Sequence, residues 1–139
     1  MLVAVIGGSL QGIEATYLAQ KAGWEVLLID KDADAPASGL CDQFIQFDVA
    51  STNDISDILR GVDLIIPALE NNGALTSLKR CADFIGTPLA FDPAAYAISS
   101  SKIRSDHLFA WIGVPAPKPW PRCGFPVLVK PDSASGSSG

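Results

Sequence analysis

The fold is decided by the segment Leu2-Val-Ala-Val-Ile-Gly-Gly-Ser-Leu-Gln-Gly12 and the residues that follow it. Its first five residues are continuously apolar and stop at two glycines, as expected for a strand that is buried on both faces of a parallel sheet. Apolar residues then recur at helical spacing as far as Ala22, and a second apolar run, Glu25–Ile29, precedes Asp30. These residues predict one β-α-β unit with a right-handed crossover.

The segments further along the chain continue this alternation. We expect strands at Phe44–Phe47, Val62–Pro67 and Leu89–Phe91, and helices at Asp54–Leu59, Asn71–Phe84 and Ser99–Ile112. Strands that alternate with helices predict an α/β fold with a doubly wound parallel sheet.

The composition changes after the last of these helices. Prolines at positions 115, 117, 119 and 121 favour an extended connector. The apolar segment Phe125–Pro131 then predicts a new strand, which is followed by a serine/glycine run up to Gly139. A strand and a loop with nothing after them cannot form a domain, so we expect the sequence to be cut off inside a second domain. The expected organisation is a nucleotide-fold domain at residues 1–98, a helix and proline-rich connector at residues 99–124, and the start of the second domain at residues 125–139.

Composition excludes several classes of protein. Apolar residues make up 48% and charged residues 18% of the chain, which is typical of a globular domain. The net charge is −5 without a basic cluster, which argues against a nucleic-acid partner. The three cysteines are an odd number and are far apart, so they predict free thiols in a reducing compartment. With neither a signal peptide nor an apolar run of about 20 residues, the sequence predicts a cytoplasmic protein without a membrane span.

The first glycine loop, Gly7–Gly12, lies where ligands of open α/β sheets bind. A dinucleotide-binding fingerprint needs glycine where Ser9 stands, which argues against an NAD-dependent oxidoreductase. The loop amides can still hold an anion such as a substrate carboxylate, and a tight structural turn is the alternative. Asp30 stands where a dinucleotide-binding protein places its ribose-binding acid. It could instead cap the next turn, and a ribose contact to another nucleotide stays open.

Glu70 follows the fourth predicted strand and stands beside Asn71 and Asn72. A carboxylate at this edge can pair with a substrate ammonium group. The alternative is a helix N-terminus, where Glu and Asn are favoured for capping and dipole reasons, and the two roles are compatible.

Two lysines suggest phosphate binding. Lys102 is predicted in the first turn of a helix, where a cation is electrostatically unfavourable unless an anion such as phosphate compensates it. Lys130 ends an apolar strand and precedes the serine/glycine run, as in a polyphosphate cradle. The alternatives are a solvated surface lysine for Lys102, and a tag or linker for the serine/glycine run. The single histidine, His107, has no partner at catalytic or metal-ligand spacing, so neither a metal site nor a catalytic triad is expected.

Lys102, Gly113–Pro117 and Phe125–Pro131 with its serine/glycine run resemble the start of ATP-grasp carboxylate–amine ligases. The resemblance implies a pre-ATP-grasp domain that is followed by the truncated start of the ATP-grasp domain, with ATP and Mg²⁺ as cofactors. It also implies that Lys102 and Lys130 contact the ATP phosphates, and that the loop over residues 133–139 closes over them with Ser137 as hydroxyl donor.

Asp30, which follows the second predicted strand, is counted with the predicted ATP-binding residues. The magnesium ligands, the adenine pocket and the catalytic residues would lie beyond Gly139. We therefore expect this chain alone to be inactive.

Three further stretches, Gly7–Tyr17, Pro67–Asn71 and Phe91–Tyr96, resemble the PylC family of pyrrolysine-biosynthesis ligases. That family joins 3-methyl-D-ornithine to the side-chain amine of L-lysine through an acyl phosphate. The resemblance implies that Leu10, Gln11 and Glu70 contact the amino-acid substrate.

The expected partners are ATP and small amino acids, without nucleic acid or membrane, and a homodimer is compatible with this interpretation. The first loop is also similar to that of purine-biosynthesis carboxylases and carbamoyl-phosphate-type ligases. Another ATP-grasp enzyme and a non-catalytic binding module therefore stay as alternatives.

Overall fold

The chain divides into two compact units, Met1–Phe91 and Asp92–Gly139, in a computed structural model that describes residues 1–51 and 54–133. The helices and strands of the first unit are β1 (Leu2–Ile6), α1 (Leu10–Lys21), β2 (Glu25–Asp30), the 3-10 helix η1 (Pro36–Gly39), β3 (Gln43–Gln46), α2 (Ser56–Leu59), β4 (Leu64–Pro67) and α3 (Asn72–Ile85). The second unit contains α4 (Pro93–Ser99) and α5 (Lys102–Ile112).

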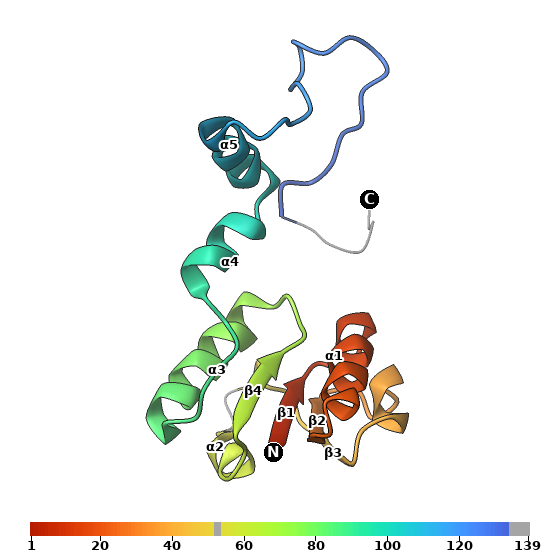
Figure 1. Cartoon of the computed structure of the whole chain (residues 1–139), viewed down its shortest axis with the longest axis vertical. Coiled ribbons are helices and arrows are strands. Elements are labelled where there is room, and N and C mark those ends of the chain that lie inside the picture. Colours follow the sequence, from red (N-terminus) through yellow and green to blue (C-terminus); the bar gives the residue numbers. More distant parts are fainter. Residues whose placement is uncertain (52–53, 134–139) are drawn as a thin grey trace. The chain divides into compact units, whose positions relative to one another are not determined.

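The first unit is built on a parallel sheet with the strand order β3-β2-β1-β4 (Figure 1). Strand β1 lies in the interior, where Val5 pairs with Leu28 of β2 on one side and with Ile66 of β4 on the other. The predicted β-α-β unit and the parallel α/β sheet are confirmed. In a parallel sheet all strands end at the same edge, so the loops after β1, β2 and β4 meet there.

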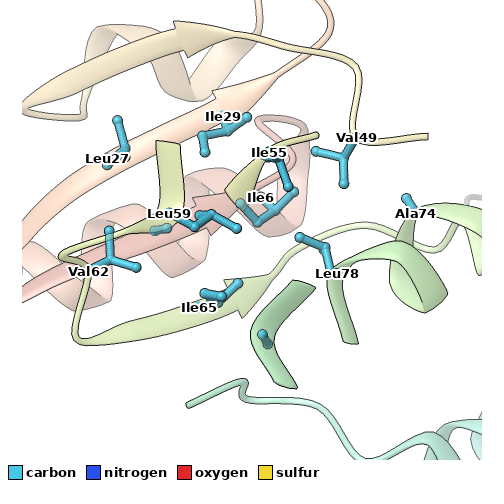
Figure 2. Close-up of a cluster of buried hydrophobic side chains, with 12 residues drawn as sticks. Ile6, Leu27, Ile29, Val49, Ile55, Leu59, Val62, Ile65, Ala74 and Leu78 are labelled. Atoms are coloured by element: carbon cyan, nitrogen blue, oxygen red, sulfur yellow. The ribbon is translucent and has the colours of Figure 1, made fainter. Parts of the chain in front are cut away.

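Side chains of the two inner strands alternate between the two faces of the sheet, and each face has its own hydrophobic core. The α2–α3 core is closed by residues of α2 and α3, as Figure 2 shows. Its buried members are Ala4, Ile6, Leu27, Ile29, Val49, Ile55, Leu59, Val62, Ile65, Ala74, Leu78 and Ala82. The α1 core on the opposite face consists of Val3, Val5, Ala19, Val26, Leu28, Ala37 and Ala68. The sheet is therefore covered on both faces, as the continuous apolar runs predicted.

The predicted strand at Leu89–Phe91 is reduced to a single bridge between Ile65 and Leu89. Ile65 donates its amide to the carbonyl of Pro88 and accepts from the amide of Ala90. Pro88 and Pro93 lack an amide hydrogen and flank this run, so only a short stretch is available to extend the pairing with β4.

The second unit differs from the prediction at its helices. The predicted helix Ser99–Ile112 begins at Lys102, because the Ser101 hydroxyl accepts the amide of Arg104 and caps α5. Helix α4 was not predicted, although its start signal is present in the sequence. The Asp92 carboxylate accepts the amides of Ala94 and Ala95, and proline occupies the first turn.

The predicted strand at Phe125–Pro131 is wrong for this structure, because no strand is assigned there. A strand needs a hydrogen-bonded neighbour, and the described residues of the second unit contain no strand that could supply one. The side chains of Leu128 and Val129 are 79% and 87% exposed. The connector before this segment is turned rather than fully extended, because Arg122 donates its amide to the carbonyl of Pro119.

Candidate functional site at the carboxyl edge of the sheet

A cavity of about 340 Å³ opens at the carboxyl edge of the first unit's sheet. The loops after β1, β2, β3 and β4 all contribute to it, which is the usual place for a ligand in an open α/β sheet. We call it the carboxyl-edge pocket, and the polar residues that bear on its chemistry are Ser9, Asp30, Lys31, Asp32, Asp48 and Asn71.

The glycine loop beside this pocket is a tight structural turn. Gly7 has a φ of 103°, and a Cβ there would lie 2.6 Å from the carbonyl oxygen of Ala68. A Cβ on Gly12 would lie 2.0 Å from the carbonyl oxygen of Gly7. Both glycines are therefore required by backbone packing before any ligand is considered.

Asp30 holds this loop in place. Its Oδ2 accepts the amide of Gly8 at 2.5 Å, and its Oδ1 accepts the amide of Asp32 at 2.8 Å. The capping role that was the alternative for Asp30 is therefore present, and one loop amide is already engaged by a carboxylate of the chain. Contact of Asp30 with ATP stays a prediction.

Two of the three predicted substrate residues meet at this edge. Gln11, in the first turn of α1, donates its Nε2 to Oε1 of Glu70, in the loop after β4, at 3.0 Å. Leu10 is 73% exposed beside Gln11. Next to Glu70, the Asn71 side chain accepts the amide of Ala74 at 3.0 Å and caps α3. The helix-capping interpretation thus describes Asn71, while the substrate role of Leu10, Gln11 and Glu70 stays a prediction.

The surroundings of the two lysines differ from those expected. Lys130 is exposed and does not end a buried strand, so burial does not force an anion onto it. The N-terminus of α5, which was expected to need a phosphate near Lys102, is compensated by Asp132, whose Oδ1 accepts the amide of Ile103 at 3.0 Å. Asp132 was missed in the sequence analysis because it lies 29 residues from its partner. Ser137 lies outside the described residues. ATP binding by Lys102, Lys130 and Ser137 stays a prediction.

Within residues 1–51 and 54–133, no group of three or more His, Cys, Asp or Glu side chains could hold a metal ion. No helix in this part of the chain is long and apolar enough to cross a membrane. All three cysteines are free, and burial raises the pKa of Cys41 and Cys81.

Comparison with known proteins identifies the family of the first unit. A family model described as "PylC-like, N-terminal domain" matches residues 3–89, which lie entirely within Met1–Phe91.

A curated relative covers almost the whole chain. The 3-methyl-D-ornithine--L-lysine ligase of Methanosarcina barkeri is 37% identical over 138 residues, which are 99% of this chain and 38% of that protein. This chain thus spans 37–38% of the length of the Methanosarcina relatives that it matches.

Solved structures share the fold. The N5-carboxyaminoimidazole ribonucleotide synthetase of Thermotoga maritima is 25% identical with a TM-score of 0.64, and the match covers 84% of this chain and 32% of that one. The N5-carboxyaminoimidazole synthetase of Staphylococcus aureus, complexed with ADP, is 20% identical with a TM-score of 0.63 over 81% of this chain and 29% of that one. The latter likeness concerns the fold alone.

Proposed function

The chain belongs to the PylC-like N-terminal domain family, and on this premise we propose that it forms the amino-acid-binding end of an ATP-dependent carboxylate–amine ligase of the ATP-grasp type. The Methanosarcina barkeri relative is named for 3-methyl-D-ornithine and L-lysine. We extend this pair of substrates to the protein that carries the present chain, with the side-chain amine of lysine as the acceptor in pyrrolysine biosynthesis.

The observation that carries the proposal is the hydrogen bond between Gln11 and Glu70 at the carboxyl edge of the sheet. A carboxylate is the natural partner of an ammonium group, and a side-chain amide can donate to a carboxylate. Both groups of a free amino acid can thus be matched by one pair of side chains that already lie within hydrogen-bond distance of each other.

The charge of the neighbouring carboxyl-edge pocket supports the same class of substrate. Three carboxylates, Asp30, Asp32 and Asp48, line the pocket with a single ammonium group, that of Lys31. Such a lining attracts a diamino acid and repels a ribose phosphate. This balance favours an amino-acid ligase over the purine-biosynthesis enzymes that share the fold.

The proposed reaction has two balanced steps. The γ-phosphate of ATP is transferred to the carboxylate of 3-methyl-D-ornithine, which gives an acyl phosphate and ADP. The lysine amine then attacks the acyl carbon, phosphate leaves, and the amine loses a proton. We assign to Lys102 and Lys130 the neutralisation of charge on the phosphates, which is the main task in enzymatic phosphoryl transfer. Bound Mg²⁺ would add to this neutralisation.

Kinetics of the full-length protein test the proposal. Wild-type protein with ATP, 3-methyl-D-ornithine and L-lysine should release ADP and phosphate and form the amide that joins the two amino acids through the side-chain amine of lysine. Glu70→Gln should raise the KM of one amino acid about ten-fold or more, as expected for the loss of a hydrogen bond to a charged group. The melting temperature should change little, because Glu70 is exposed.

The matched control is Glu25→Gln, the same substitution at an exposed position at the other end of the sheet. It should leave both KM values unchanged. Unfolding of Glu70→Gln with unchanged KM values would make Glu70 structural. Turnover of a ribose phosphate with bicarbonate, in place of the two amino acids, would favour the purine-type alternative.

A further inference from the structure

The N-terminus of α5 is held by a residue from beyond the proline-rich connector. The Asp132 carboxylate accepts the Ser101 hydroxyl at 2.9 Å through Oδ1 and at 3.1 Å through Oδ2, and its Oδ1 also accepts the Ile103 amide at 3.0 Å. The Ser101 hydroxyl oxygen in turn accepts the Arg104 amide at 3.2 Å. Asp132 therefore joins two segments of the second unit that are about 30 residues apart in the sequence.

The same residue contacts Lys102 twice. The backbone carbonyl of Asp132 accepts the amide of Lys102 at 3.2 Å and its Nζ at 3.3 Å. Together with the contacts of Ile103 and Arg104, this accounts for three successive amides of the first turn, which helices otherwise leave without a partner inside the helix. The first turn of α5 is thus satisfied by residues of this chain.

Asp132 also stands two positions after Lys130. The contacts with α5 restrain the chain at Asp132, so they limit where Lys130 can be relative to Lys102. Ordering a lysine side chain costs rotamer entropy, and a pre-positioned backbone reduces what else must be ordered when a ligand binds.

Burial of Ser101 and the charge of Asp132 both favour the contact between them. Ser101 is only 8% exposed, so its hydroxyl needs a partner within the protein. The backbone amide of Ile103, followed by the hydroxyl of Ser101, lowers the pKa of Asp132, which is therefore ionised at neutral pH. An ionised acceptor makes stronger hydrogen bonds than a neutral one.

We propose that Asp132 is a positioning residue, which sets Lys102 and Lys130 at a fixed separation so that both meet one polyphosphate. The proposal rests on the proposed function, because it needs an ATP-dependent enzyme. Asp132 acts through the two lysines and through the backbone, and it makes no contact with the nucleotide itself. A free carboxylate at this place would repel a phosphate. The Asp132 carboxylate is instead hydrogen-bonded to Ser101 and Ile103 at the N-terminus of α5.

The test compares Asp132→Ala with Asp106→Ala in the full-length protein. Asp106 is an exposed aspartate of α5, so its substitution removes the same charge without the contacts described above. Asp132→Ala should weaken binding of ADP, measured by calorimetry, about ten-fold, since small displacements of binding groups have effects of this order or more. The KM values of the amino acids should not change, because the predicted substrate residues Gln11 and Glu70 belong to the first unit.

A double-mutant cycle separates positioning from general stabilisation. In a Lys130→Ala background, Asp132→Ala should weaken ADP binding by clearly less than ten-fold, because one of the two positioned groups is already absent. Equal ADP affinity of Asp132→Ala and Asp106→Ala would overturn the proposal, as would full additivity with Lys130→Ala.

If Asp132→Ala does not fold, Asp132→Asn replaces it. The asparagine keeps the shape but weakens the contacts with Ser101 and Ile103, so ADP affinity should lie between those of the wild type and of Lys130→Ala. Wild-type affinity of Asp132→Asn would overturn the proposal. Failure of the proposed function is recognised separately, because the wild-type protein itself would then not form product from ATP, 3-methyl-D-ornithine and L-lysine.

Discussion

At the scale of single residues, the carboxyl edge combines positions required by packing with positions that are open to a ligand. Gly7 and Gly12 approach the backbone too closely for any side chain, whereas Gln11 and Glu70 contact each other at an exposed surface. A glycine loop at this place is therefore not by itself a sign of phosphate binding. The exposed polar pair is the better indicator of function, because packing does not require it.

Gly12→Ala should destabilise the first unit strongly. The added Cβ would lie 2.0 Å from the carbonyl oxygen of Gly7, so either the loop or α1 must move. The free energy of unfolding in urea should fall by about 3 kcal/mol or more, as expected for steric conflict at a buried position.

Gly39→Ala is the matched control for this prediction. A Cβ at Gly39 meets nothing within 4 Å, so the free energy of unfolding should change by less than about 1 kcal/mol. Similar losses of stability in the two variants would show that the close approach of Gly12 to Gly7 is not what makes glycine necessary.

At the scale of helices and strands, local patterns predicted the first unit well and the second unit poorly. Strand β1 and helix α1 follow from apolar periodicity and from the glycines that bound them, and these signals lie within a few residues of the element itself. The contact of Asp132 with α5 joins residues 29 to 31 positions apart, and no periodicity records it. Apolar composition alone predicted a strand at Phe125–Pro131, but pairing depends on a neighbouring strand that the sequence of the segment does not reveal.

In the candidate site, too, some contacts could be predicted from the sequence and others could not. The proximity of Gln11 and Glu70 could be expected, because both follow strands that end at one edge of a parallel sheet. The engagement of Asp30 with the amide of Asp32 could be named only as one of two alternatives, since an acid at the end of β2 suits either a ligand or a turn. Its contact with the amide of Gly8 was not predicted.

The N-terminal contact of α5 should depend on pH in one direction. The amide of Ile103, the hydroxyl of Ser101 and the charge of Lys102 lower the pKa of Asp132 from its ordinary value of 3.8. A carboxyl group with a lowered pKa stabilises the folded state above its unfolded pKa, and this contribution is lost as the pH falls through the folded pKa. The contact should therefore be constant from about pH 5 upward and should break in acid.

The amide proton shift of Ile103, followed by NMR in the 139-residue chain, measures this titration. Its midpoint should lie below 3.8, and Asp132→Asn should abolish the acid transition. A midpoint at or above 3.8 would mean that the carboxylate is not held by the helix in solution.

At the scale of the whole molecule, the chain consists of two units with different kinds of support. Every buried residue of the two hydrophobic cores belongs to the first unit, Met1–Phe91. Within the described part of the second unit only Ser101 is buried, whereas Phe109, Trp111 and Phe125 are exposed. The first unit should therefore carry most of the stability, since buried apolar area is the main favourable contribution to folding.

A fragment that ends at Phe91 should fold by itself. Its thermal unfolding, followed by circular dichroism, should be cooperative, with a midpoint within a few degrees of the first transition of the 139-residue chain. A matching fragment that ends at Leu69 serves as the negative control, because it lacks α3 and with it Ala74, Leu78 and Ala82 of the α2–α3 core. Loss of cooperativity in the longer fragment would mean that residues after Phe91 are needed for the fold.

The sheet of the first unit also acts as a partition between two separately packed interiors. Val5 faces the α1 core and its chain neighbour Ile6 faces the α2–α3 core, so a void opened on one side cannot be filled by a larger side chain on the other. Substitutions on opposite faces should then act on unfolding free energy almost independently, whereas substitutions within one face should be strongly coupled. Side chains of the α1 core, next to the proposed substrate contacts of Gln11, can accordingly be substituted while the packing of the α2–α3 core stays unchanged. Compensating substitutions should therefore fall into two separate sets, which share the backbone of the strands that lie between them.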